Sequence, residues 1–185
     1  MGHGSQASGN YSTAIGFYAQ ASGVSSTAMS SSKASGDNST AMGSSNASGV
    51  GSTAMGTLTW ANGHFSTAMG QFTVANGIVS TAMGYNGVAS GVASTAMGWG
   101  TKANGNNSTA MGNMTWANGI SSTAMGIGSQ ALGKSSTAMG TLTWAYGIGS
   151  TAMGSLTQAY GDNSTAMGLN TKAKRAKTHW KVLKR

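Results

Sequence analysis

A five-residue motif, Ser-Thr-Ala-Met-Gly, recurs along almost the whole chain and constrains its fold more than any other feature. Twelve copies, two of them with one changed residue, begin at Ser12, Ser26, Ser39, Ser52, Ser66, Ser80, Ser94, Ser108, Ser122, Ser136, Ser150 and Ser164. Consecutive copies are 14 residues apart, except for two 13-residue steps that end at Ser39 and Ser52. A fixed short period is typical of solenoids, in which each repeat stacks only on its neighbours.

The length of the repeat decides what each unit can be. Fourteen residues are too few for a helical hairpin, but they fit two strands of about four residues and two tight bends. One glycine follows the pentad methionine, as in Met55-Gly56, and another ends the Ala-x-Gly segment, as in Ala61-Asn62-Gly63. Both lie where the coil is expected to bend. Both short units lack one residue between the pentad and the next alanine (30–34 and 43–47 against 56–61), which predicts a turn there because turns absorb length changes. The sequence predicts an all-β parallel solenoid of about 13 coils over residues 1–171, about 60 Å long.

Alternation along a strand predicts which side chains face the interior. The slot of Trp60 holds lysine or glutamine in other coils, as at Lys33 and Gln130, so it faces water. Thr59 and Ala61 then face inward. A coil this thin is filled by small side chains, so the Ser and Ala of the pentad are also expected inside.

The same alternation places the Thr and Met of the pentad outside, in two rows along the rod. A continuous exposed apolar stripe is typical of an interface, so we expect association of several rods along this side. The expected interface residues are Ile15, Met29, Met42, Met55, Met69, Met83, Met97, Met111, Met125, Met139, Met153 and Met167. An alternative, in which methionine fills each coil and Ser and Ala lie outside, stays open because methionine packs well in irregular interiors.

The alternation of Ser-Thr-Ala-(Ile/Met)-Gly with Ala-x-Gly resembles the YadA-like head of trimeric autotransporter adhesins. Asn38 to Gly43 and Asn163 to Gly168 carry the motif closely, and Ser12 to Gly16 keeps the isoleucine. The resemblance covers residues 2 to about 173. It implies a left-handed parallel β-roll, a parallel homotrimer that is in contact along the Val/Ile positions of the motif, and adhesion to a host surface, matrix protein or glycan.

Location follows from the same resemblance, which implies the cell surface or the extracellular space. No basic segment followed by an apolar one marks a signal peptide, and no stalk or anchor follows the repeats. We therefore expect either a place within a longer adhesin or display by another route, such as a fibre on a viral particle.

The last 14 residues differ from the rest. Residues 172–185 hold seven of the ten basic residues, whereas the other 171 carry three lysines and two aspartates. Ala173, Ala176, Trp180 and Leu183 follow a helical spacing, which favours a terminal cap on the open end of the solenoid. A flexible tail, or binding of nucleic acid or an anionic membrane through Lys172–Arg185, are the alternatives.

The composition argues against catalysis and metal binding. The chain has no cysteine, only two acidic residues (Asp37 and Asp162) and three scattered histidines, so neither a metal site nor a catalytic acid–base pair is expected. We expect no enzyme activity, no catalytic residues and no cofactor.

Two surface features are candidates for function. Aromatic side chains are enriched where surfaces bind, which singles out Trp60, Trp116 and Trp144 in one slot and Trp99 in another. Regular threonine rows suggest an ice-binding solenoid as the alternative function. An adhesive or structural rod is preferred, because one threonine row is expected inside and the other is shared with methionine.

Overall fold

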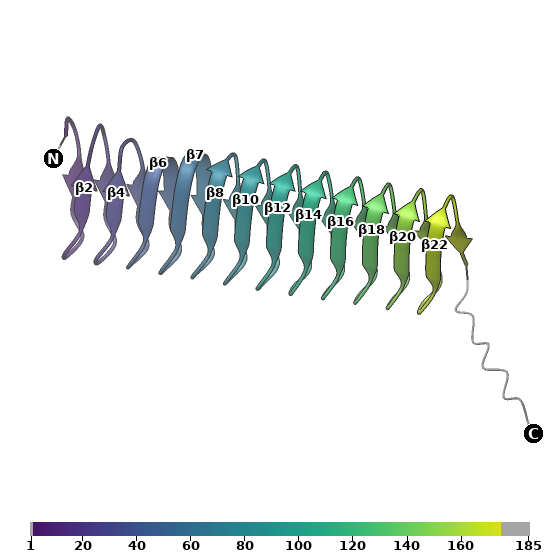
Figure 1. The fold of residues 1–185 in the computed structure, drawn as a ribbon. Helices are drawn as coiled ribbons and strands as arrows, with labels where there is room; N and C mark the ends of the chain where they lie inside the picture. The colour runs from purple at the N-terminus through teal and green to yellow at the C-terminus, as the bar shows by residue number, and fades with distance from the viewer. Residues whose placement is uncertain (1, 175–185) are drawn as a thin grey trace, which may run out of the picture.

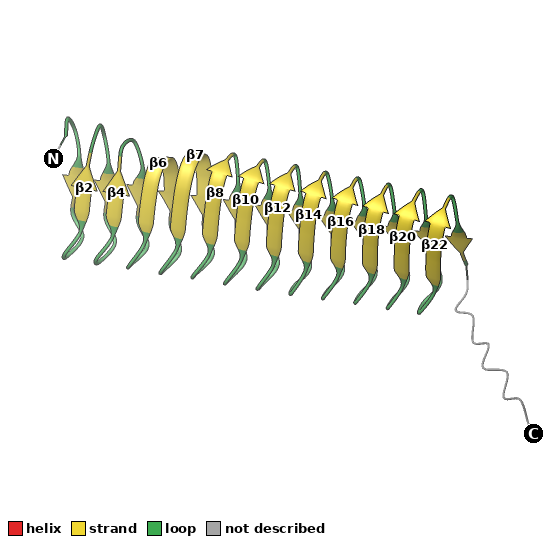
Figure 2. Cartoon of the chain, viewed as in Figure 1, coloured by secondary structure: helices red, strands yellow, loops and turns green. Residues whose placement is uncertain are grey.

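The chain folds into a straight β-solenoid (Figure 1). The computed structural model describes residues 2–174, and the expected cap and the remainder of the basic tail at 175–185 lie outside the described residues. Strand β2 lies at one end of the rod and β22 at the other, with every coil stacked on the next (Figure 1). Strands and loops make up the whole described chain (Figure 2), which confirms the predicted all-β parallel solenoid.

Each coil contributes one longer strand, which carries the Thr-Ala-Met segment. These strands are β2 (Thr13–Ile15), β4 (Thr27–Met29), β6 (Thr40–Ala47), β7 (Thr53–Ala61), β8 (Thr67–Gln71), β10 (Thr81–Tyr85), β12 (Thr95–Trp99), β14 (Thr109–Asn113), β16 (Thr123–Ile127), β18 (Thr137–Thr141), β20 (Thr151–Ser155) and β22 (Thr165–Leu169). Each pairs in parallel with the equivalent strand of the next coil, so that identical residues lie in register, such as Met83 with Met97.

The second side of the coil is formed by two-residue strands that end in alanine. They are β1 (Gln6–Ala7), β3 (Gln20–Ala21), β5 (Lys33–Ala34), β9 (Val74–Ala75), β11 (Val88–Ala89), β13 (Lys102–Ala103), β15 (Trp116–Ala117), β17 (Gln130–Ala131), β19 (Trp144–Ala145), β21 (Gln158–Ala159) and β23 (Lys172–Ala173). In β6 and β7 the two sides join into one strand. Strand β23 pairs with β21, so the solenoid continues through Ala173.

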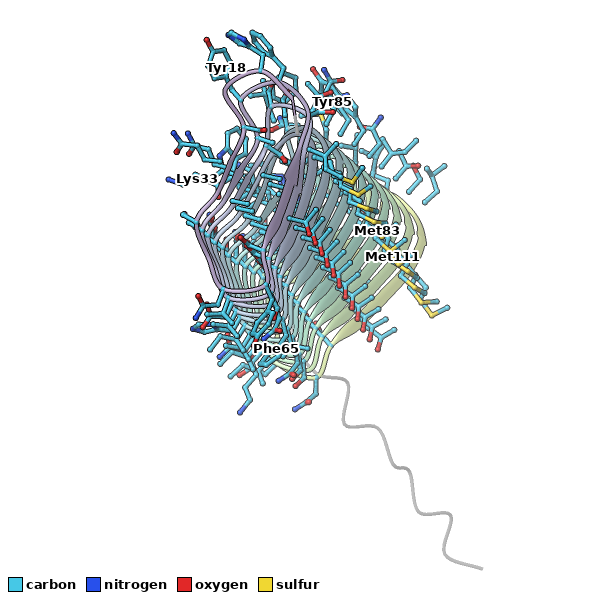
Figure 3. All side chains as sticks on the ribbon, turned by 90° about the vertical axis from the view of Figure 1, so that its left-hand side faces the viewer. Tyr18, Lys33, Phe65, Met83, Tyr85 and Met111 are labelled. Atoms are coloured by element: carbon cyan, nitrogen blue, oxygen red, sulfur yellow. The ribbon has the colours of Figure 1, made fainter. Side chains whose placement is uncertain are left out.

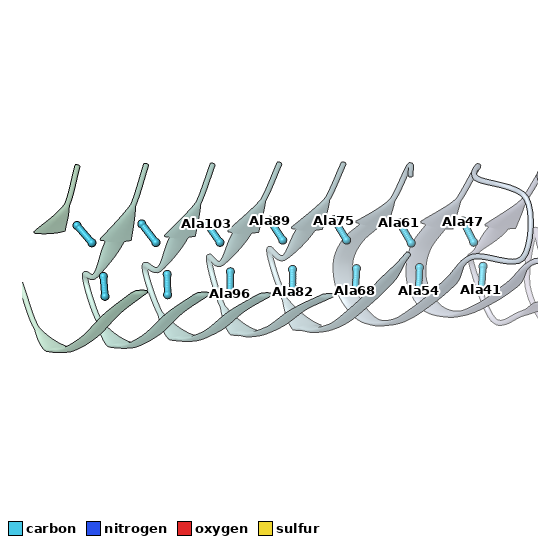
Figure 4. Close-up of a cluster of buried hydrophobic side chains, with 14 of the residues drawn as sticks. Ala41, Ala47, Ala54, Ala61, Ala68, Ala75, Ala82, Ala89, Ala96 and Ala103 are labelled. Atoms are coloured by element: carbon cyan, nitrogen blue, oxygen red, sulfur yellow. The ribbon is translucent and has the colours of Figure 1, made fainter. Parts of the chain in front are cut away.

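The interior is built from the smallest side chains, as predicted. All buried hydrophobic residues in the described part of the chain are alanines, which meet across the coil from the two strand types (Figure 4). The pentad serines from Ser26 to Ser164 are also buried, as are Thr59, Thr73, Thr101, Thr115, Thr143 and Thr157. No methionine between residues 2 and 174 is buried, so the alternative arrangement with methionine inside is wrong.

The bends correct one expectation about glycine. Several positions with positive φ carry other residues, among them Leu58 (52°), Phe65 (55°) and Val79 (57°). Hydrogen bonds between coils hold these residues, as when the Phe65 amide donates to the Val50 carbonyl over 2.8 Å. Gly63 and its equivalents have no positive φ. They are glycine because a Cβ there would collide with the carbonyl group of the next coil's glycine.

The two short repeats lose their residue in different ways. At 30–34 the expected bend is present, just before β5. At 43–47 the chain stays within β6, and a register shift against β7 between Ser44 and Asn46 absorbs the difference. The expected turn is therefore confirmed in the first case and replaced by a strand irregularity in the second.

Candidate functional site

A row of sulfur-containing side chains follows one side of the rod. It consists of Ile15 and the eleven pentad methionines from Met29 to Met167, and we call it the methionine row. Met83 and Met111 lie in it on the side of the rod opposite Lys33 (Figure 3). Parallel register places each methionine beside the next, for example Met97 between Met83 and Met111.

The side chains of the methionine row are neither fully buried nor fully exposed to solvent. Met29, Met111 and Met167 are 38%, 37% and 56% exposed, and the other methionines are half-buried. Each side chain lies against its neighbours along the row, whereas Met167 has no coil with a methionine beyond it in the described chain. The pentad threonines form a second outward row beside it, half-buried in most coils. This surface has the position and exposure expected of the predicted interface residues, whose contact with a partner stays a prediction.

The opposite face of the rod carries the outward residues of the short strands. Here Trp116 lies between Lys102 and Gln130, and Trp144 lies between Gln130 and Gln158. Trp60 occupies the same slot near the N-terminal end, between Asn46 and Val74. All three tryptophans are half-buried. The Lys102 ammonium group lies over the Trp116 ring, 5.2 Å from its centre.

Trp99 belongs to a different row, at the end of β12. It pairs in register with Tyr85, and the two rings stack with centres 6.3 Å apart and planes inclined by 6°. Phe72 meets Tyr85 edge-on at 5.7 Å. The structure thus groups Trp60, Trp116 and Trp144 in one slot and separates Trp99 from them by the bend that precedes β13.

The two acidic residues have a structural task that the sequence analysis missed. Asp37 and Asp162 each accept a hydrogen bond through Oδ1 from a backbone amide of the preceding coil, that of Val24 and that of Ile148, both over 2.8 Å. His64 Nδ1 does the same for the Val50 amide at 3.1 Å. The signal was present in the sequence, since one slot of the repeat is Val or Ile in several coils but holds Asp37, His64, Asn106 and Asp162 in the coils that follow Val24, Val50, Val92 and Ile148.

The remaining polar groups of the described chain are spread along the rod. No cluster of three or more His, Cys, Asp or Glu side chains forms between residues 2 and 174. The pentad serines are buried in the coil wall, where Ser150 Oγ, for example, donates to the Gly147 carbonyl over 2.7 Å. No helix among residues 2–174 is long and apolar enough to cross a membrane.

The threonine rows do not favour the ice-binding alternative. Thr59, Thr73, Thr101, Thr115, Thr143 and Thr157 are fully buried. They cannot meet a surface of ice. The pentad threonines face outward but share their face with the methionine row.

The C-terminal end of the solenoid is hollowed. A cavity of about 590 Å³ is lined by residues of the last coil, including Thr165, Met167, Thr171 and Lys174.

The repeats match a known family. The model of the YadA head domain repeat matches residues 1–19, 7–29, 21–46, 47–73, 61–86, 89–113, 117–143 and 145–171. A search of curated proteins found no match. The family consists of surface-exposed adhesins of a structural type, and both its repeat and its parallel β-solenoid are present here. The matches span most of the chain, which therefore belongs to the YadA head domain repeat family.

Proposed function

We propose that this chain is the adhesive head of a homotrimeric surface rod, in which three parallel copies pack along the methionine row. The observation that carries the proposal is the row itself, an outward apolar stripe held in register over twelve coils. Burial of such a stripe between protomers is favourable because apolar area leaves water.

The absence of charged side chains favours a tight contact along this side. The methionine row and the adjacent threonine row carry no ionisable side chain, so association desolvates no charge. The opposite face carries Lys33 (Figure 3) and, in the same slot of a later coil, Lys102. In the proposed trimer it stays outside the contact and is free to meet a partner. The proposed partners are a host surface, a matrix protein or a glycan, met at the cell surface or on a viral particle.

The experiment is light scattering on the purified chain and on a double variant, Met97→Lys with Met111→Lys. The parent should have three times the 18.3 kDa chain mass. The variant should have the mass of one chain with its strand signal in circular dichroism largely kept, because burying ammonium groups at an interface costs several kcal/mol each.

A matched control adds the same charge to the other face. Val74→Lys with Val88→Lys uses a slot that already holds lysine in other coils, such as Lys102, and should leave the trimer intact. A parent mass of one chain, or dissociation by both variants, would refute the proposed interface. Adhesion is then tested by retention on cultured cells of beads coated with the parent or with each variant.

A further inference from the structure

The C-terminal third of the face opposite the methionine row carries an unusual concentration of aromatic and amide side chains. Trp116 and Trp144 occupy the same slot two coils apart, with Gln130 between them. Two coil steps at the usual strand spacing correspond to about 10 Å. Both indoles are half-buried and therefore held against the sheet.

A second row runs beside these residues, two positions further along each coil. Tyr146 and Tyr160 are 40% and 44% exposed, and their rings stack with centres 4.8 Å apart and planes inclined by 2°. The Tyr160 hydroxyl donates to Gln158 Oε1 over 2.8 Å, which ties this row to the tryptophan row on the same face. Asn118 lies in the second row and accepts a hydrogen bond through Oδ1 from Asn104 Nδ2 at 2.8 Å. Aromatic rings and oriented amides are thereby fixed side by side.

The charge of this region restricts the kind of partner. Between residues 103 and 171 the chain has one lysine, Lys134, and one aspartate, Asp162, so the formal net charge is zero. Both belong to the bend that precedes the pentad, and the Asp162 carboxylate accepts the Ile148 amide. A nucleic acid needs cations to neutralise its phosphates, and a basic peptide needs carboxylates. The tryptophan slot carries neither from Trp116 to Gln158, and its lysines lie only at the borders of this stretch, Lys102 over the Trp116 ring and Lys172 beside Gln158. An uncharged partner rich in hydroxyl groups matches it.

We propose that the aromatic–amide patch, made of Trp116, Asn118, Gln130, Trp144, Tyr146 and Tyr160, binds an uncharged, extended polysaccharide that runs along the rod. Tryptophan and tyrosine supply rigid apolar area for the C–H faces of sugar rings, and the amides and phenols bond to the hydroxyls. The two-coil repeat of tryptophan is close to the length of one disaccharide unit in a β-1,4-linked chain. The inference rests on the proposed function, to which it gives the chemical class of ligand.

The test uses the full chain, with cellohexaose and chitohexaose as soluble probes in isothermal titration and insoluble cellulose and chitin in pull-down. The variant is Trp116→Gln with Trp144→Gln, because glutamine already fills this slot at 130 and 158 and should fold there. Trp60→Gln is the matched control, since Trp60 occupies the same slot outside the patch. The double variant should lose affinity roughly tenfold or more, as at other aromatic hot spots, and the control should bind like the parent.

The outcomes separate this inference from the trimer. Light scattering on the same samples should give the same mass for the parent and for Trp116→Gln with Trp144→Gln. Failure of the parent to bind either oligosaccharide or either insoluble polymer overturns the inference whatever the mass. Equal loss in Trp60→Gln overturns it too, as does binding only to heparin or single-stranded DNA. Binding by a protein with the mass of one chain supports the patch and refutes the trimer.

Discussion

The bends of the solenoid hold ordinary residues in a backbone conformation that favours glycine and asparagine, and this makes stability adjustable one residue at a time. Val79 has φ of 57° and Leu156 has φ of 56°. A left-handed conformation costs an L-residue about 1–2 kcal/mol, and asparagine tolerates it better because its short side chain bonds locally. Equivalent bends of other coils already carry asparagine, at Asn107 for the Val79 slot and at Asn170 for the Leu156 slot.

We therefore expect Val79→Asn and Leu156→Asn each to raise the free energy of unfolding by about 1 kcal/mol. Little packing is lost, because the two side chains are 57% and 41% exposed. The backbone bonds that fix the bends, from the Val79 amide to the His64 carbonyl (2.8 Å) and from the Leu156 amide to the Thr141 carbonyl (2.9 Å), do not depend on the side chain.

The assay is thermal unfolding followed by circular dichroism at one fixed protein concentration, so that any association contributes equally. Each variant should melt about 2–4 °C higher than the parent, and the two effects should add because the sites are several coils apart. Ile127→Asn is the control, since Ile127 is 56% exposed, has no positive φ and pairs with Asn113 in the same slot of the preceding coil, and it should give no gain. Unchanged or lower melting of Val79→Asn, or an equal gain in Ile127→Asn, would refute the strain argument.

Three further outcomes follow from the same geometry. Gly77→Ala should prevent neighbouring coils from stacking, because its Cβ would collide with the Gly91 carbonyl, and the protein should melt at a lower temperature or become insoluble. Gly87→Ala is the control and should have a much smaller effect, because its Cβ would come no nearer than 3.3 Å to the Thr101 hydroxyl. Asp37→Ala should cost about 0.5–1 kcal/mol in denaturant unfolding, because the Val24 amide loses its acceptor at an exposed site where water replaces part of the bond. Asp37→Asn should recover most of the loss, since Asn106 accepts the Val92 amide in the same way. A thermal hysteresis assay on the purified chain should find no activity, since the inner threonine row is buried and the outer one shares its face with the methionine row. Measurable activity would support the ice-binding alternative.

The sequence was sufficient for the architecture because each coil is specified locally and then repeated. The slot shared by Trp60, Lys33 and Gln130 identified the solvent-exposed side of the strand. Strand alternation then placed Ala61 and Ala54 inside, as the structure confirms. It also placed methionine outside. What contacts the methionine row, and what contacts Trp60, Trp99, Trp116 and Trp144, depends on other molecules, so these assignments stay predictions.

The details that escaped prediction are contacts between neighbouring coils that join residues 13 to 15 apart. The bond from the Val24 amide to Asp37 and the side-chain bond from Asn62 Nδ2 to Asn76 Oδ1 (2.9 Å) exist only once coils are stacked. Positive φ at Phe65 and Val79 has the same origin. Bonds to the neighbouring coil impose the bend on whatever residue is present, so local preference for glycine was a poor guide.

The difference between inward and outward positions explains how such a chain can acquire function without changing its fold. The inner positions are limited to Ala, Ser, Thr and Gly by the thin interior, and Gly63 with its equivalents by contact with the next coil. The outward slots carry no such restriction, so Lys102, Trp116, Gln130 and Trp144 follow one another in a single slot with the same backbone pairing. A new pattern of outward side chains therefore costs the fold little. In the proposed trimer the side that packs against other copies has to stay uniform along the rod, and the methionine row is the side that repeats most regularly, whereas the variable side is the one proposed to recognise a ligand.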